Sequence, residues 1–305
     1  MTGIQTNALK LFLSNHTQIN HLTKITAAAI DYLTNSELED DKLSQKINNL
    51  ILESKQRWTP RYIQNPKKEL NITKNELVKS LIVVVYSAFE VFYTETVGYV
   101  SDNLKKAKVN STIGTEVENL PKLSELYKTL HWGTVEIDKI NEVYSFFKCL
   151  RNCVAHNFGN PTKRLLDIYD SEQFKNQINN WETKFKDRSL SKPPIITSTE
   201  ILLEPHHSIL YSETCLRIAK DMTNNVYETL GIGYFINQIS KKYILEIENI
   251  DTPCSSLAKY INLNLKRKYN IKINDIKIIK TELEKLKNYN SIKNKYNYLK
   301  ENNGG

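Results

Sequence analysis

Apolar residues recur at every third or fourth position over long stretches of this chain, which is the spacing of one face of an α-helix. The stretches at residues 9–33, 136–156 and 208–230 are the clearest examples. Glycine and proline, the residues that most often interrupt helices, number only 9 and 8 among 305 residues. The sequence therefore predicts an all-α fold and argues against a turn-rich β-sandwich or a glycine-rich phosphate-binding loop.

Basic residues gather in the last quarter of the chain. Residues 232–305 contain 14 basic and 7 acidic side chains, whereas residues 1–231 contain 28 and 27. A basic segment of this kind attracts polyanions, RNA among them. The alternative is an ordinary amphipathic helix with a solvated lysine face, and the sequence leaves both interpretations open.

Helix-breaking residues and the change in composition predict three parts. We expect an N-terminal helical extension at 1–70, a helical domain at 71–235 and a small basic C-terminal appendage at 236–305. A strand-like run at 243–250 would make the appendage α+β.

Cysteine usage and hydropathy indicate an intracellular protein. Four cysteines in 305 residues are too few for a disulfide scaffold, and the N-terminus lacks the basic-then-apolar pattern of a signal peptide. The most apolar run, residues 81–89, is shorter than the roughly 20 residues that span a bilayer. We therefore expect a cytoplasmic protein with no membrane partner.

Local signals mark the ends of several helices. Thr73 followed by Glu76 has the pattern of a capping box, so a long helix is expected to begin there and to run to about Val100. The helix expected at 136–156 ends before Gly159, a common stop signal. Further helices are expected at 121–130, 170–186, 208–230, 255–269 and 275–299.

The helix at 136–156 carries the residues with the most chemical interest. On a helical wheel, His156 lies nearly opposite the apolar arc that would face the core. Asn152 lies one turn before it on the same side, and Arg151 lies on the flank of the arc. The arc itself consists of Ile140, Val143, Phe147, Leu150 and Val154.

Three further residues of this helix are expected to face outward, namely Phe146, Cys149 and Cys153. An apolar outward face that also carries polar groups predicts a surface for a partner. The two cysteines are one turn apart, but with one histidine they are too few to hold a metal ion, so we interpret them as packing residues.

The run Arg151-Asn152-x-x-x-His156 resembles the Arg-x(4–6)-His motif of the HEPN superfamily, in which a polar residue often follows the arginine. The context is also similar, because a long helix bearing residues 87–90 precedes the motif and a further helix follows it. The resemblance covers residues 72–235 and implies a small helical bundle. Many HEPN domains are metal-independent endoribonucleases that act as dimers, and several are toxins or effectors of anti-phage defence.

The resemblance implies a role for each motif residue. His156 would act on the 2′-hydroxyl or the leaving 5′-oxygen as general base or acid, as histidine can near neutral pH. Arg151 would hold the scissile phosphate and stabilise the charge of the transition state. Asn152 would orient His156 or a phosphate oxygen. Two copies would each supply one such set across the 151–156 helix, the products would carry 2′,3′-cyclic phosphate and 5′-hydroxyl ends, and no metal or other cofactor is required.

Three neighbours complete the candidate site. Lys148 and Arg164 flank the motif and could bind RNA phosphates, although exposed basic residues are more often plain solvated charges. Glu90 could pair with Arg151 and hold it in place.

Simpler interpretations also remain open. His156 could cap the end of its helix, Arg151 could be structural, and Asn152 could be an ordinary surface amide. The alternative function is a non-catalytic HEPN module that binds a nucleotide or docks on a partner protein. A regulatory partner protein is compatible with either function.

Overall fold

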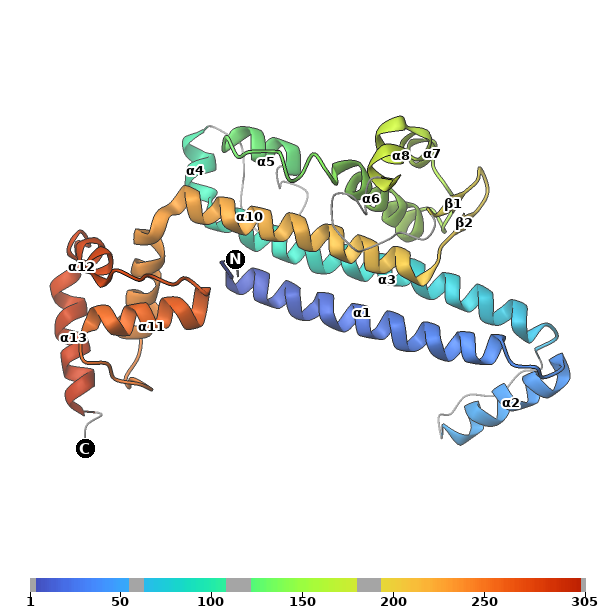
Figure 1. Cartoon of the computed structure of the whole chain (residues 1–305), viewed down its shortest axis with the longest axis horizontal. Coiled ribbons are helices and arrows are strands. Elements are labelled where there is room, and N and C mark those ends of the chain that lie inside the picture. The colour runs from blue at the N-terminus through green and yellow to red at the C-terminus, as the bar shows by residue number, and fades with distance from the viewer. Residues whose placement is uncertain (1–3, 55–62, 108–121, 180–192, 303–305) are drawn as a thin grey trace. The chain divides into compact units, whose positions relative to one another are not determined.

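The computed structural model describes residues 4–54, 63–107, 122–179 and 193–302, and these residues are predominantly helical (Figure 1). The predicted all-α class is confirmed. The helices are α1 (Asn7–Thr34), α2 (Asp40–Glu53), α3 (Pro66–Tyr99), α4 (Ser101–Lys106), α5 (Leu123–Thr129), α6 (Asn141–His156), α7 (Lys163–Asp170), α8 (Glu172–Asn179), α10 (Pro205–Ser240), the π-helical turn η2 (Lys241–Leu245), α11 (Leu257–Tyr269), α12 (Ile276–Glu284) and α13 (Tyr289–Asn302). Strands β1 (Ile195–Ile196) and β2 (Ile201–Leu202) pair antiparallel in the only sheet of the described residues.

Two compact units make up the chain. The first comprises Met1–Leu11, Val91–Gly133 and Ala219–Gly305, and the second comprises Phe12–Glu90 and Thr134–Ile218. Helices α1, α3 and α10 each contribute residues to both units. Each unit therefore combines segments that are distant in sequence, which differs from the sequential division at residues 70 and 235 expected above.

Aromatic side chains from four helices form the core of the second unit. The ring of Phe89 in α3 contacts those of Phe12 in α1 and Tyr144 in α6, with centroids 5.8 and 5.6 Å apart. Phe147 in α6 stacks on Tyr211 in α10 at 5.0 Å. All five side chains are buried. Because burying an aromatic side chain contributes about 2–3 kcal/mol, these contacts hold α1, α3, α6 and α10 together as a helical bundle.

Helices α7 and α8 pack against α6 in the same unit, where Figure 1 shows the three helices together. Phe146 of α6 stacks on Phe174 of α8 with the ring centroids 4.5 Å apart. The side-chain oxygen of Gln177 in α8 accepts a hydrogen bond from the backbone N–H of Glu142 at 3.0 Å. That bond satisfies one of the free donors at the start of α6.

Several predicted boundaries need correction. Helix α6 begins at Asn141 rather than at residue 136, because residues 135–140 form turns. The single helix expected at 170–186 is wrong: α7 begins at Lys163, and Ser171 separates it from α8. Residues 180–186 lie outside the described part of the chain.

The capping box expected at Thr73 is also wrong, because α3 begins earlier, at Pro66. Proline suits the first turn of a helix, where its missing N–H costs nothing. The hydroxyl of Thr73 instead donates to the carbonyl of Glu69 at 2.8 Å, as a threonine inside a helix does. The expected end near Val100 is confirmed, since α3 ends at Tyr99.

Helix α3 is long and apolar enough, by length and composition alone, to cross a membrane. An 18-residue window within it has a mean hydropathy of 1.6, and 39% of that window is buried inside the protein. The apolar segment is thus longer than the run at 81–89 indicated. A buried core helix has the same properties, so this is weak evidence for a membrane span.

The C-terminal part of the first unit has a hydrophobic core of its own, which includes Phe235, Ile239, Ile261, Leu265, Ile292 and Tyr296. The strand expected at 243–250 is wrong, because Lys241–Leu245 form the turn η2 and irregular backbone follows. The basic appendage is therefore helical, not α+β, in its described residues. Its lysine-rich segment forms two helices, α12 and α13, rather than one.

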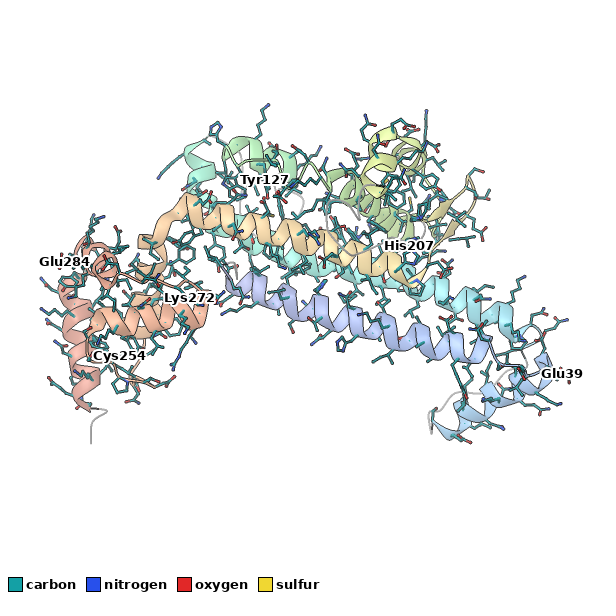
Figure 2. All side chains as sticks on the ribbon, viewed as in Figure 1. Glu39, Tyr127, His207, Cys254, Lys272 and Glu284 are labelled. Carbon is teal, nitrogen blue, oxygen red and sulfur yellow. The ribbon has the colours of Figure 1, made fainter. Side chains whose placement is uncertain are left out.

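Helix α10 continues through the stop expected after Leu230. Gly231 adopts φ +69° and ψ 170°, which produces a kink rather than an end. Only glycine takes such a conformation without steric cost. In this unit the phenol of Tyr127, labelled in Figure 2, donates a hydrogen bond to Asp221 of α10 at 2.6 Å.

Candidate active site

The C-terminal end of α6 positions the motif residues. The helix ends at His156, and its last carbonyls are closed by a turn in which the carbonyl of Cys153 accepts from the backbone N–H groups of Asn157 and Gly159, each at 3.0 Å. The φ angles of Phe158 and Gly159 are +52° and +78°. These two residues reverse the chain direction and leave the last helical turn accessible to solvent.

The side chains of Arg151, Asn152 and His156 come together at this end. Nη1 of Arg151 donates to Oδ1 of Asn152 at 3.0 Å and lies 3.3 Å from Nε2 of His156. Arginine can only donate, so this contact is a hydrogen bond only in the tautomer in which Nε2 carries the lone pair. Asn152 and His156 are exposed, and Arg151 is half-buried. The motif therefore presents a guanidinium and an imidazole side by side to solvent.

The aromatic ring of Tyr86 in α3 contacts the guanidinium of Arg151. The guanidinium carbon lies 4.3 Å from the centroid of the Tyr86 ring. Partial burial and the neighbouring carboxylate of Glu90, to which the phenol donates a hydrogen bond, raise the pKa of Tyr86 to about 12, while the positive charge of Arg151 acts in the opposite direction. Tyr86 is therefore a neutral phenol at physiological pH. Its hydrogen bond with Glu90 connects that carboxylate to the site.

No family model, no curated protein and no solved structure matches this chain. The geometry of the described residues therefore carries the functional argument.

The apolar outward face expected on α6 does not exist. Phe146, Cys149 and Cys153 are buried, at 0%, 8% and 1% exposure. The reason is that α6 is covered on two sides: Phe147 packs toward α10, while α7 and α8 cover the side that carries Phe146. A helical wheel with one core-facing arc does not predict that α7 and α8 cover a second side of α6. The exposed strip that remains on α6 near its end is polar, apart from Ala155.

The two cysteines are packing residues, as the sequence predicted. The sulfur of Cys153 lies 3.5 Å from the hydroxyl oxygen of Thr162, which caps α7. Burial raises the pKa of the Cys149 thiol, against the opposing effect of its hydrogen bond with Thr162. Among the described residues, no group of three or more His, Cys, Asp and Glu side chains is arranged to hold a metal ion.

The predicted flanking cations lie on two different helices. Lys148 is half-buried on α6, one turn before Arg151 and on the same side of the helix. Arg164 is exposed on α7, where its charge acts on Cys149.

Sequence reasoning missed three residues near the motif: Tyr86, Lys79 and Phe158. Lys79 of α3 pairs with Glu76 at 2.7 Å, and its Nζ lies 3.8 Å from the point where a Cβ on Gly159 would stand. Lys79 and Tyr86 are seven residues apart on α3 and so share one side of it. The sequence signal that could have identified Lys79 and Tyr86 is their helical spacing, which places two polar groups on one side of an apolar helix. Phe158 follows His156 by two residues and is 99% exposed.

Proposed function

We propose that this chain is a HEPN-type endoribonuclease that cuts RNA without a metal ion and leaves 2′,3′-cyclic phosphate and 5′-hydroxyl ends. The observation that carries the proposal is the convergence of Arg151, Asn152 and His156 at the exposed end of α6. A guanidinium beside an imidazole supplies two functions that transesterification at phosphorus uses, one group to stabilise charge and one to transfer the proton.

The chemistry follows from the contacts. An RNA phosphate would take the N–H donors of Arg151 that now point at Nε2 of His156, and this exchange would free Nε2 for the 2′-hydroxyl. Nε2 would accept the hydroxyl proton while the 2′-oxygen bonds to phosphorus. The bond from phosphorus to the 5′-oxygen would then break, and the leaving oxygen would take a proton from an imidazolium. Arg151 would stabilise the additional negative charge on the phosphate oxygens throughout.

Dimerisation is part of the proposal for a chemical reason. The reaction needs a base and an acid, and each chain brings one motif histidine to the end of α6. A second copy of the chain would supply the other histidine. Because Phe146, Cys149 and Cys153 are buried, the proposed dimer contact would use the polar end of α6 instead of an apolar face. As the resemblance implies, we place the activity in the cytoplasm among toxin or anti-phage ribonucleases, with a partner protein as a candidate regulator.

The test is RNA cleavage in EDTA by wild type, His156→Ala and Arg151→Ala. Total tRNA and a long mRNA serve as substrates, and the product ends are analysed chemically. His21→Ala, which removes an exposed histidine from α1, is the matched control. We expect cyclic-phosphate ends from wild type and from the control only. Cleavage that survives in His156→Ala would contradict the proposal.

One contact favours the second candidate, a non-catalytic module that binds a nucleotide or a partner. With Nε2 of His156 engaged by Arg151, the site can exchange that bond for an anion without any proton transfer. This candidate predicts that wild type leaves RNA intact, binds a nucleotide with a Kd that Arg151→Ala weakens, and is not toxic to cells that express it.

A further inference from the structure

Phe158 holds an unusual position for a large apolar side chain. It is 99% exposed, and its φ of +52° falls in the left-handed region that a bulky residue rarely adopts. Gly159, which adopts this region easily, follows it with φ +78°. The backbone therefore holds the ring of Phe158 outside the protein, two residues beyond His156.

The turn that carries Phe158 is fixed by its own hydrogen bonds. The backbone N–H of Gly159 donates to the carbonyl of Cys153 at 3.0 Å, and that of Asn160 donates to the carbonyl of Asn157 at 2.8 Å. The side-chain amide of Asn157 donates to the carbonyl of Asn160 at 2.9 Å. These bonds fix the backbone of the turn from which the ring of Phe158 projects.

The residues of the turn that carries Phe158, and the nearest cation to Gly159, are polar or charged. The neighbours of Phe158 in the turn are Asn157, Gly159 and Asn160, and Nζ of Lys79 lies beside Gly159. His156 is two residues before Phe158 in the chain, and Nη1 of Arg151 lies 3.3 Å from Nε2 of His156. A docking surface for an apolar protein needs a larger contiguous apolar patch. An exposed aromatic ring on a turn next to cationic residues is instead a combination by which proteins bind single-stranded nucleic acid.

We infer that Phe158 is the platform on which an unpaired base next to the scissile phosphate stacks, so that the substrate is single-stranded at the cut. This inference rests on the proposed ribonuclease site. In a regular RNA helix each base is held by its neighbours and by its pairing partner. Stacking one base on Phe158 would hold the nucleotide splayed open, which allows the 2′-oxygen to line up with the leaving 5′-oxygen.

The first experiment measures binding without cleavage. The full chain with His156→Ala is titrated with a fluorescent single-stranded oligoribonucleotide and with the same sequence as a duplex. Phe158→Ala and Phe158→Asn are then added to that variant. Asparagine tolerates positive φ, so it keeps the turn and removes only the ring. Tyr32→Ala, which removes another exposed ring of the same unit, is the control.

We expect both substitutions at Phe158 to weaken single-strand binding about tenfold, as loss of one stacked base does. Phe158→Trp should bind as tightly as the parent, and the salt dependence should stay the same because no charge is removed. Equal affinity of the parent and Phe158→Asn, equal affinity for duplex and single strand, or no measurable binding of single-stranded RNA would each overturn the inference.

Cleavage assays with His156 intact, on wild type and on Phe158→Asn alone, separate this inference from the proposed function. If wild type does not cut RNA but binding depends on the ring at position 158, the proposed ribonuclease fails and the stacking site remains. If wild type cuts RNA and Phe158→Asn cuts at the same rate with the same preference for unpaired sites, the ribonuclease stands and the stacking role is wrong.

Discussion

The guanidinium of Arg151 lies over the ring of Tyr86, with 4.3 Å between its carbon and the ring centroid. The two residues come from different helices, α6 and α3, so this contact links the motif to the rest of the bundle. Nε of Arg151 is buried and has no hydrogen-bond partner among the described residues. The ring face therefore holds the guanidinium by cation–π attraction, while Nη1 stays directed at Asn152 and His156.

Replacing Tyr86 tests whether the ring positions Arg151. We expect Tyr86→Phe to keep most of the RNA cleavage and Tyr86→Leu to lose roughly tenfold in kcat/KM, because a cation–π contact is worth about 1–2 kcal/mol when partly desolvated. Thermal melting of each variant separates loss of position from loss of folding. Equal rates for the leucine and phenylalanine variants would show that the ring face has no positioning role.

Arg151→Lys should lose at least about a hundredfold in the rate of cleavage, although it keeps the positive charge. A lysine lacks the planar fork that stacks on Tyr86 and binds phosphate through two N–H groups. Kinetics with single-stranded RNA under single-turnover conditions measure the effect. A lysine variant close to wild type would mean that only the charge at this position matters.

Titration of Tyr86 predicts a loss of stability at alkaline pH. Its pKa is raised from 10 to about 12 in the folded protein, so the neutral phenol is the form that folding favours. The stabilisation is fully present below pH 10 and is lost as the pH rises toward 12. After allowance for solvent screening, the raised pKa of Tyr86 accounts for about 1 kcal/mol of the free energy of unfolding that is lost over this pH range. Urea unfolding across this range should show a shallower decline for Tyr86→Phe than for wild type, and parallel curves would contradict the assignment.

Helix periodicity predicted the long helices well, because each buries a continuous stripe over many turns. The expected helices at 9–33 and 255–269 correspond closely to α1 and α11, and the glycine signal correctly placed the end of α6 at His156. Local spacing does not say how many neighbours a helix has, and for that reason Phe146 was placed outside when α8 covers it. The apolar residues at 243–250 have the pattern of a strand, but they pack into a helical core. A short turn and irregular backbone are enough to bury them there.

The site was predictable only in the part that lies on one helix. Residues 151, 152 and 156 share the last turns of α6, so their spacing was enough to bring them together. The contact with Tyr86 depends on how α3 packs against α6, which no single-helix pattern contains. The exposure of Phe158 depends on the backbone of the turn after α6. Phenylalanine rarely adopts a positive φ, so the residue type alone does not predict this conformation.

Truncation should affect protein stability very differently at two phenylalanines near the motif. Phe146→Ala should lower the free energy of unfolding by about 3–5 kcal/mol, since the ring is fully buried against Phe174. Phe158→Ala should change it by less than about 0.5 kcal/mol, because the ring is exposed. Chemical denaturation of both variants beside wild type provides the measurement. A mild effect of Phe146→Ala would restore the outward apolar face as a surface for a partner.

Gly159 is the residue on which the geometry of the turn after α6 depends. Its φ is +78°, and a Cβ added there would meet Nζ of Lys79 only at 3.8 Å, so the cost of Gly159→Ala is conformational rather than steric. We expect a loss of about 1 kcal/mol in stability together with slower RNA cleavage, because the positions of both His156 and Phe158 follow from this turn.

Gly98→Ala is the matched control: it lies within α3, a Cβ there meets nothing within 4 Å, and the change should stabilise the chain by about 0.5–1 kcal/mol. Melting curves and cleavage rates for the two variants, measured in parallel, decide the matter. A Gly159→Ala variant that cleaves at the wild-type rate would show that the motif on α6 works independently of the turn.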